Sequence, residues 1–379
     1  MPAAIASSVD LFVRQDDPRR FRFVESSAPE PAALAEGEVL ARIEKFGFSA
    51  NNVTYAVLGK SDIINYFDFF PTDEAGWGRV PVWGMGVIAA SRHPDLLCGE
   101  RMYGYFPLAR YARLRAARMT PFGFDVDRGA LPAVYNQYTL TRSDPFHLPG
   151  HEDTMIVFRP LVLTSILLDD FIADGHDYFG AESITIASAS SKTSFGLAAM
   201  LVRRNAGRAI VGLTSARHAA FVEKLGVYSR VVTYDEIGKL PAVPTVFVDV
   251  AGDAGVRDAA RSRLGSNLRT TITVGLSHWD KAGGAPAAAA TSSEPTLFFF
   301  APAWVEKRRE DWGAAALGQK IAGAWLEFMG RAGEWVRIVH GAGNDAVASV
   351  YARMVDGRCG PEDAHVLSLW EDAFTAPSC

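Results

Sequence analysis

The segment Ser183–Ser190 consists of β-branched and small residues, and further small hydroxyl-bearing residues come after it. The chain continues as Ala-Ser-Ala-Ser-Ser-Lys-Thr-Ser-Phe-Gly over residues 187–196. A turn between a strand and a helix can hold the pyrophosphate of a dinucleotide, and glycine usually keeps this turn tight and open. Here serines take the glycine spacing, so their hydroxyls and the ammonium of Lys192 would bind phosphate oxygens. The alternative is a serine-rich turn that only caps the next helix. The candidate cofactor-binding residues of this turn are Ser188, Ser190, Ser191, Lys192, Thr193 and Ser194.

Hydroxyl and cationic side chains also end the next apolar run, Ala209–Thr214. In folds that bind dinucleotides, an acidic residue at this strand end binds the ribose 2′-hydroxyl of NAD, whereas arginine accommodates the 2′-phosphate of NADP. The sequence has no acidic residue there and instead has Thr214, Ser215 and Arg217. This pattern favours NADP, with a plain capped helix and a solvated arginine as the alternative.

The sequence pattern predicts two different domains that would position these residues. The 379 residues suggest two domains. The first 150 residues contain short β-type runs broken by glycine and proline, which predicts a mostly β domain. The regular part from about 183 to 275 alternates strands with helices, which predicts a parallel sheet whose ligands bind at the carboxyl ends of the strands. The β-type runs of the first part are Val39–Phe48, Val80–Ala90 and Arg101–Pro107, and the segment Pro160–Ile172 has helical spacing.

Composition narrows the classes of partner. Lys and Arg number 38 and Asp and Glu 43, which gives a net charge of −5 without a basic run. Nucleic acid and an anionic membrane are therefore not expected as partners. Cys98, Cys359 and Cys379 are too scattered for a disulfide framework or a zinc knuckle. No apolar run reaches the length of a membrane span, so a cytoplasmic protein that acts on small molecules is expected.

The order of these segments resembles the medium-chain dehydrogenase/reductase superfamily, and most closely its zinc-free quinone and enoyl reductases. The resemblance implies an α/β fold with a GroES-like β domain over 1–150, completed by part of 335–379, and a Rossmann-type doubly wound parallel sheet over 151–334. It also implies NADPH as the cofactor, hydride transfer, and a homodimer joined through edge strands, with Thr296–Pro302 as the edge. The segments that carry the resemblance are Gly37–Leu40, Gly47–Asn52, Pro81–Ile88, Gly99–Tyr105, the serine-rich turn, Thr214–Arg217, Lys224–Gly226 and Phe247–Gly252.

The resemblance also implies site residues. Zinc-dependent members carry a Cys-Gly-x-Asp motif after the early strand, but residues 48–55 here contain no cysteine or histidine, so no metal is expected. Without a metal, hydroxyl and amide groups must polarise the acceptor oxygen and supply a proton. Asn51 and Thr54 match positions that line the active site in the zinc-free relatives. Tyr55, next to them, and Tyr135, in the segment leading to the second domain, are the candidate proton donors, and the pattern does not choose between them. Thr164 and Gly275 match positions near the cofactor.

The leading hypothesis is an NADPH-dependent reductase of a carbonyl or α,β-unsaturated compound. The aromatic segment Tyr66–Phe70 suggests a wall for an apolar, unsaturated substrate. A non-redox lyase, hydratase or hydrolase on the same scaffold, or a sensor that binds NADPH without turnover, are the alternatives. The small and polar segment Lys281–Ser293 is a surface connector or a lid.

Overall fold

The computed structural model of the chain describes residues 6–61, 65–274 and 296–374. The chain forms two compact units: unit 1 comprises Met1–Val157 and Arg337–Cys379, and unit 2 comprises Phe158–Val336. The sequence suggested a division near residue 150, but helix α2 (Glu152–Asp174) continues across the division, so its first residues belong to unit 1 and the rest to unit 2.

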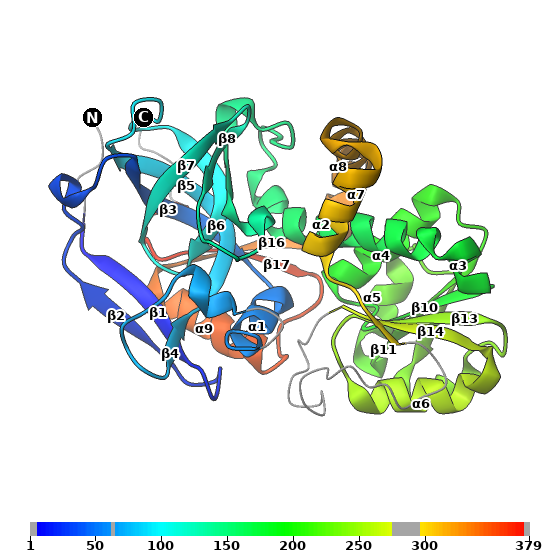
Figure 1. Ribbon diagram of the computed structural model, residues 1–379. Coiled ribbons are helices and arrows are strands. Elements are labelled where there is room, and N and C mark those ends of the chain that lie inside the picture. The colour runs from blue at the N-terminus through cyan, green and yellow to red at the C-terminus, as the bar shows by residue number, and fades with distance from the viewer. Residues whose placement is uncertain (1–5, 62–64, 275–295, 375–379) are drawn as a thin grey trace. The chain divides into compact units, whose positions relative to one another are not determined.

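Unit 1 is built on antiparallel strands that close into a barrel (Figure 1). One sheet has the order β2-β1-β4, and another has the order β16-β17-β3-β5-β6-β9-β8-β7. Because β3 also pairs with β7, the strands from β3 to β7 in this order form a closed barrel without free edges. The C-terminal strands β16 and β17 join this sheet through β3. The strands are β1 (Ser8–Arg14), β2 (Phe21–Ser26), β3 (Glu38–Phe48), β4 (Trp77–Arg79), β5 (Pro81–Ser91), β6 (Arg101–Pro107), β7 (Tyr111–Thr120), β8 (Gly123–Val126), β9 (Gln137–Leu140), β16 (Arg337–Ala342) and β17 (Asp363–Ser368).

Short helices follow or connect these strands. Helix α1 starts directly after β3 because Ser49 and Asn52 form a capping box. The Ser49 side chain accepts a hydrogen bond from the backbone N–H of Asn52, and the Asn52 side chain accepts one from the backbone N–H of Ser49. The amide of Asn52 also donates to the carbonyl of Pro81 at the start of β5, at 3.1 Å. The helical elements of unit 1 are α1 (Ala50–Val57), α9 (Gly343–Val355) and the 3₁₀ turns η1 (Pro31–Ala33), η2 (Tyr66–Phe69), η3 (Ala133–Asn136) and η4 (Thr141–Ser143).

Unit 2 contains a parallel sheet of order β12-β11-β10-β13-β14-β15 with helices around it (Figure 1). The chain order reverses between β10 and β13, and in such sheets ligands bind at the carboxyl ends of the strands at this position. The strands are β10 (Ser183–Ala187), β11 (Ala209–Thr214), β12 (Arg230–Thr233), β13 (Thr245–Asp249), β14 (Leu268–Thr273) and β15 (Thr296–Phe298). The helical elements are the larger part of α2, α3 (His176–Gly180), α4 (Lys192–Arg204), α5 (Ala219–Lys224), α6 (Ala254–Leu264), α7 (Ala301–Trp312), α8 (Ala314–Trp335) and the 3₁₀ turns η5 (Ala216–His218), η6 (Tyr234–Lys239) and η7 (Gly265–Asn267).

The predicted fold class is confirmed: a GroES-like β barrel accompanies a parallel sheet with helices. The strands predicted over Val39–Phe48 and Val80–Ala90 differ by one residue at their ends, and two other elements differ more. The helix expected over Pro160–Ile172 begins at Glu152, because acidic residues suit the positive end of the helix dipole and the next turn buries Met155. The edge strand expected over Thr296–Pro302 ends at Phe298, because Pro302 lies in the first turn of α7, where its fixed φ is favourable. No helix among the described residues is long and apolar enough to span a membrane.

Candidate functional site

Buried tyrosines from separate elements of unit 1 meet in one group, which we call the tyrosine cluster: Tyr55 of α1, Tyr66 of η2, Tyr105 of β6 and Tyr135 of η3. None of these side chains is more than 8% exposed. The ring centroids of Tyr55 and Tyr66 are 4.6 Å apart, and those of Tyr105 and Tyr135 are 4.8 Å apart. The phenol groups therefore lie in an apolar environment, where water does not compete for their hydrogen bonds or protons.

The phenol oxygen of Tyr55 accepts two hydrogen bonds. Asn51 Nδ2 donates to it at 2.7 Å from the same helix, and Trp83 Nε1 donates to it at 3.1 Å from β5. Burial raises the pKa of Tyr55 above its ordinary value, and the phenol of Tyr135 raises it further, while the bonds from Trp83 and Asn51 act in the opposite direction. Tyr55 is therefore a protonated phenol at neutral pH, and both donors would stabilise its oxygen after the proton has left.

The hydroxyls of Tyr66 and Tyr135 lie 3.2 Å apart, so one of them donates to the other. Burial raises the pKa of both phenols. Arg128 holds the turn that carries Tyr135, since its Nη1 donates to the Tyr135 carbonyl at 3.3 Å and to Asn136 Oδ1 at 3.0 Å. The guanidinium also lies over the ring of Phe70, with 4.8 Å between its Cζ and the ring centroid.

Asn51, Tyr55 and Tyr135, three of the predicted catalytic candidates, thus belong to one group of contacts. The fourth, Thr54, precedes Tyr55 on α1 and has a half-buried side chain. Trp83 and Tyr105 are not among the candidates that the sequence predicts. Strand alternation could have found Tyr105, because Tyr103 and Tyr105 occupy alternate positions of one strand and therefore point to the same face.

In unit 2, the turn after β10 adopts the backbone conformation that glycine usually provides. Ser188 has a φ of 53°, in the left-handed region, at a cost of about 1 kcal/mol for a residue with a Cβ. The backbone N–H of Ser188 donates to the hydroxyl of Tyr234 at 3.1 Å. The serine substitution has therefore kept the shape of the turn, and Tyr234 covers one of its N–H groups.

Two hydroxyls of this turn are used within the protein. Ser191 Oγ accepts the backbone N–H of Ser194 at 3.2 Å and caps helix α4. The hydroxyl of Ser194 is fully buried and donates to the carbonyl of Ala187 at 3.0 Å. These two residues behave as the capping alternative described for the sequence. Ser188, Ser190, Lys192 and Thr193 are half-buried along the same turn.

Helix α4 approaches α2 closely at a glycine. A Cβ added to Gly196 would lie 2.6 Å from Ser165 Oγ, which itself is 2.9 Å from the carbonyl of Thr193. Thr164, a predicted cofactor residue, donates from its hydroxyl to the carbonyl of Pro160 at 2.9 Å. The sequence did not identify Gly196 as the contact that sets the position of α4.

The loops after β10 and β11 meet at the carboxyl end of the sheet. Ser190 Oγ and His218 Nδ1 are 3.1 Å apart. Thr214 is buried and Arg217 is exposed. The hydroxyl of Ser215 is buried and has no hydrogen-bond partner among the residues that the structure describes. Two further predictions, Gly275 as a cofactor residue and Lys281–Ser293 as a connector or lid, lie outside the described residues.

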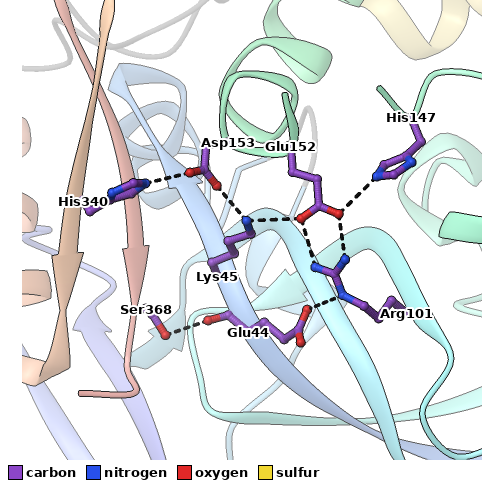
Figure 2. A network of polar contacts seen from close by, with 8 residues as sticks. All are labelled: Glu44, Lys45, Arg101, His147, Glu152, Asp153, His340 and Ser368. Atoms are coloured by element: carbon purple, nitrogen blue, oxygen red, sulfur yellow. Dashed lines mark hydrogen bonds and ion pairs between the residues drawn. The ribbon is translucent and has the colours of Figure 1, made fainter. Parts of the chain in front are cut away.

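A network of ion pairs ties the first turn of α2 to the barrel within unit 1 (Figure 2). Glu152 accepts two hydrogen bonds from Arg101, at 2.7 and 3.0 Å, and lies 3.2 Å from Lys45 Nζ. Lys45 also donates to Asp153 at 2.7 Å, and His340 Nε2 lies 2.6 Å from the other oxygen of Asp153. Figure 2 shows the residues of this network, which are Glu44, Lys45, Arg101, His147, Glu152, Asp153, His340 and Ser368.

Electrostatics keep Glu152 ionised. Burial alone would raise its pKa, but the hydrogen bonds and charge of Arg101, together with His147 and Lys45, lower the pKa to about 2. The ionised carboxylate of Glu152 therefore ties the start of α2 to the barrel through its ion pairs. Among the described residues, no three His, Cys, Asp or Glu side chains gather as metal ligands would.

Comparison with known proteins gives a family and a fold. A family model described as "Protein of unknown function (DUF2855)" matches residues 46–360. A search of curated proteins gives no match. Solved structures match over almost the whole chain at low identity. CurA from Vibrio vulnificus in complex with NADPH is 13% identical with a TM-score of 0.62, covering 95% of this chain and 98% of that chain.

Two further structures have the same fold. The yhdH oxidoreductase from Salmonella enterica in complex with NADP is 12% identical, with a TM-score of 0.53, and the quinone oxidoreductase from Coxiella burnetii is 11% identical, with a TM-score of 0.53. Each comparison covers 95% of this chain and 99% of the other chain.

Proposed function

This chain belongs to the family described as "Protein of unknown function (DUF2855)", and we propose that it is an NADPH-dependent oxidoreductase. Its substrate is a carbonyl or α,β-unsaturated small molecule, reduced by hydride transfer without zinc. The observation that carries the proposal is the double hydrogen bond to the Tyr55 oxygen inside a buried aromatic cluster. The fold shared with structures that contain NADPH or NADP supports the cofactor.

The residues after β10 and β11 fit a dinucleotide in two respects. Ser188 holds the left-handed conformation that a tight phosphate-binding turn requires. Ser215 has a buried hydroxyl with no partner among the described residues, and a ligand oxygen would satisfy it. Ser190 and Lys192 would bind the pyrophosphate, and Ser215 with Arg217 would bind the 2′-phosphate.

Bound NADPH would supply a hydride to the substrate. Tyr55 would donate its proton to the oxygen or carbon that becomes negative, and Asn51 and Trp83 would stabilise the resulting phenolate because both already donate to this oxygen. Tyr55 is favoured over Tyr135 because the Tyr135 hydroxyl forms a bond with Tyr66. The surrounding rings would exclude water from the reacting groups.

Titration of the purified protein with NADPH and NADH, followed by calorimetry, tests the cofactor. Micromolar affinity for NADPH and weaker affinity for NADH are expected. Arg217→Ala should remove this preference, because arginine binds the 2′-phosphate. Arg230→Ala is the matched control, because Arg230 is an exposed arginine at the amino end of β12, away from the carboxyl ends of the strands. If neither dinucleotide binds, the proposal is wrong.

A second candidate is a non-redox enzyme on the same scaffold. The bond between the Ser188 N–H and Tyr234 favours it, since that N–H is then engaged within the protein. This candidate predicts that neither the unmodified protein nor Tyr234→Phe binds NADPH. The oxidoreductase predicts that the unmodified protein binds NADPH.

The proposal includes a homodimer. Strand β15 pairs with β14 on one side, and no other described strand pairs with its second edge. Phe298 on this strand is 41% exposed. An open apolar edge is a site for pairing with another chain, so β15 of a second copy would cover it.

A further inference from the structure

The hydroxyl of Tyr105 is buried without a hydrogen bond. Its side chain is 0% exposed on strand β6, and its oxygen has no hydrogen-bond partner among the residues that the structure describes. A buried hydroxyl that has lost water and gained no partner lowers the stability of a fold. Such a group is uncommon in a native protein and requires an explanation.

The other phenols of the tyrosine cluster, and that of Tyr138, have hydrogen-bond partners. Tyr138, which is equally buried, donates from its hydroxyl to the carbonyl of Tyr105 and accepts a hydrogen bond from Arg128 Nη2 at 2.9 Å. Tyr55 accepts two hydrogen bonds, and Tyr66 is bonded to Tyr135. Within the tyrosine cluster, therefore, the hydroxyl of Tyr105 alone has no hydrogen-bond partner among the described residues.

Aromatic rings enclose Tyr105 on several sides. Its ring centroid lies 4.8 Å from those of Trp83 and Tyr135, 5.4 Å from that of Phe69 and 5.5 Å from that of Tyr55. Rings at these distances form contacts that favour planar, conjugated groups.

The phenols around Tyr105 also act on its ionisation. Burial raises the pKa of Tyr105 well above its ordinary value, and the phenols of Tyr55, Tyr135 and Tyr66 raise it further, whereas Arg128 lowers it. The Tyr105 hydroxyl is therefore a neutral hydrogen-bond donor at neutral pH.

We propose that the Tyr105 hydroxyl binds substrate: it donates a hydrogen bond to an oxygen of a planar conjugated carbonyl compound that lies against these rings. This inference rests on the proposed function, because it places the substrate beside Tyr55. The substrate is uncharged, since Arg128, the cation that acts on Tyr105, is committed to Tyr135, Asn136 and Tyr138. Arg128 is the cation that acts on Tyr105 among the described residues, and it already binds other groups, so a carboxylate is not expected here.

Thermal unfolding of the ligand-free protein provides the first test. Tyr105→Phe removes an unsatisfied hydroxyl, so its unfolding temperature should equal or exceed that of the unmodified protein. Tyr138→Phe is the matched control, and it should unfold at a lower temperature because it removes two hydrogen bonds. Equal losses in the two variants would mean that Tyr105 has a partner within the protein, and would overturn the inference.

Binding of benzylideneacetone, a planar conjugated ketone, provides the second test. Calorimetric titration without NADPH should give a dissociation constant about tenfold higher for Tyr105→Phe, because one hydrogen bond is lost. β-Methylstyrene, a planar probe without oxygen, should bind both proteins equally. Tyr111→Phe, a buried tyrosine on β7 next to Trp370, should bind the ketone normally.

The outcomes separate the two proposals. Equal ketone affinity in Tyr105→Phe and the unmodified protein, or no ketone binding by either, overturns the role of Tyr105 whether or not NADPH binds. Tyr105-dependent ketone binding without any NADPH binding supports the inference about the site and overturns the oxidoreductase. With both ligands bound, steady-state reduction of benzylideneacetone should show a KM about tenfold higher in Tyr105→Phe and a kcat within about twofold.

Discussion

The side-chain amide of Asn51 donates a hydrogen bond of 2.7 Å to the phenol oxygen of Tyr55, one turn further along α1. The residues are four positions apart, so the helix alone brings them to the same face. The indole of Trp83 then adds a second donor from β5. The two donors would therefore stabilise a negative charge on the Tyr55 oxygen. Neither of them accepts the Tyr55 proton, which can be donated to another group.

Replacing Tyr55 by phenylalanine should therefore reduce kcat for enone reduction by about a hundredfold or more, because the proton donor is lost. NADPH affinity should be unchanged. NADPH oxidation at 340 nm measures the rate, and Tyr111→Phe is the control for the loss of a buried phenol elsewhere. Unchanged kcat in Tyr55→Phe would exclude Tyr55 as the proton donor.

Asn51→Ala should lower kcat about tenfold, because the phenolate of Tyr55 loses one of its two stabilising donors. Helix α1 should persist, since Ser49 and Asn52 form its capping box without Asn51's side chain. Circular dichroism and steady-state measurement of kcat check these two expectations.

Glu152 should make the protein lose stability in acid. Its pKa is lowered to about 2 in the fold, so the ionised carboxylate stabilises the folded state. This contribution is complete above the ordinary glutamate pKa of about 4.3 and disappears as the pH falls towards 2. Urea unfolding of the unmodified protein and Glu152→Gln should differ at pH 6, and the difference should shrink from about pH 4.3 downwards and close as the pH approaches 2.

The control for Glu152 is Glu25→Gln, which changes an exposed glutamate of β2. This variant should follow the unmodified protein at every pH. A constant difference between Glu152→Gln and the unmodified protein from pH 6 to pH 3 would contradict the assigned role of the ion pairs with Arg101.

Gly196→Ala should destabilise unit 2 by about 1–3 kcal/mol, because the new Cβ would lie 2.6 Å from Ser165 Oγ. Gly330→Ala is the matched helical control, since a Cβ there meets no heavy atom within 4 Å among the described residues. That variant should gain about 0.5–1 kcal/mol from reduced backbone freedom in the unfolded chain. Chemical unfolding of both variants measures the difference, and equal effects would show that α4 does not depend on this contact.

Phe298→Asp should convert the proposed dimer into a monomer, because a charge on β15 disfavours pairing of two edges. Sedimentation velocity measures the change. Phe122→Asp, at an exposed phenylalanine of unit 1, should leave the association unchanged. A monomeric unmodified protein would show that β15 does not join two chains.

The sequence by itself determined the order and type of most elements, because hydrophobic periodicity and turn residues act locally. The strands Arg101–Pro107 and Ala209–Thr214 have the same bounds in the structure as in the sequence pattern. The family resemblance pointed to Asn51, with Tyr55 as a neighbouring candidate, and the structure places both on one helix. The local pattern failed at Pro160, where packing and acidic residues at the helix start outweighed the usual position of proline.

Only the tertiary structure decided which side chains share the tyrosine cluster. Trp83 and Tyr105 reach Tyr55 through the pairing of β5 with β6, and the register of that pairing is not visible in either segment alone. The structure also decided that the Ser194 hydroxyl donates to the carbonyl of Ala187 at the end of β10. The hydroxyls of Ser215 and Tyr105 have no hydrogen-bond partner among the described residues. Whether a hydroxyl is satisfied depends on what surrounds it in three dimensions, and residue type and spacing do not contain that information.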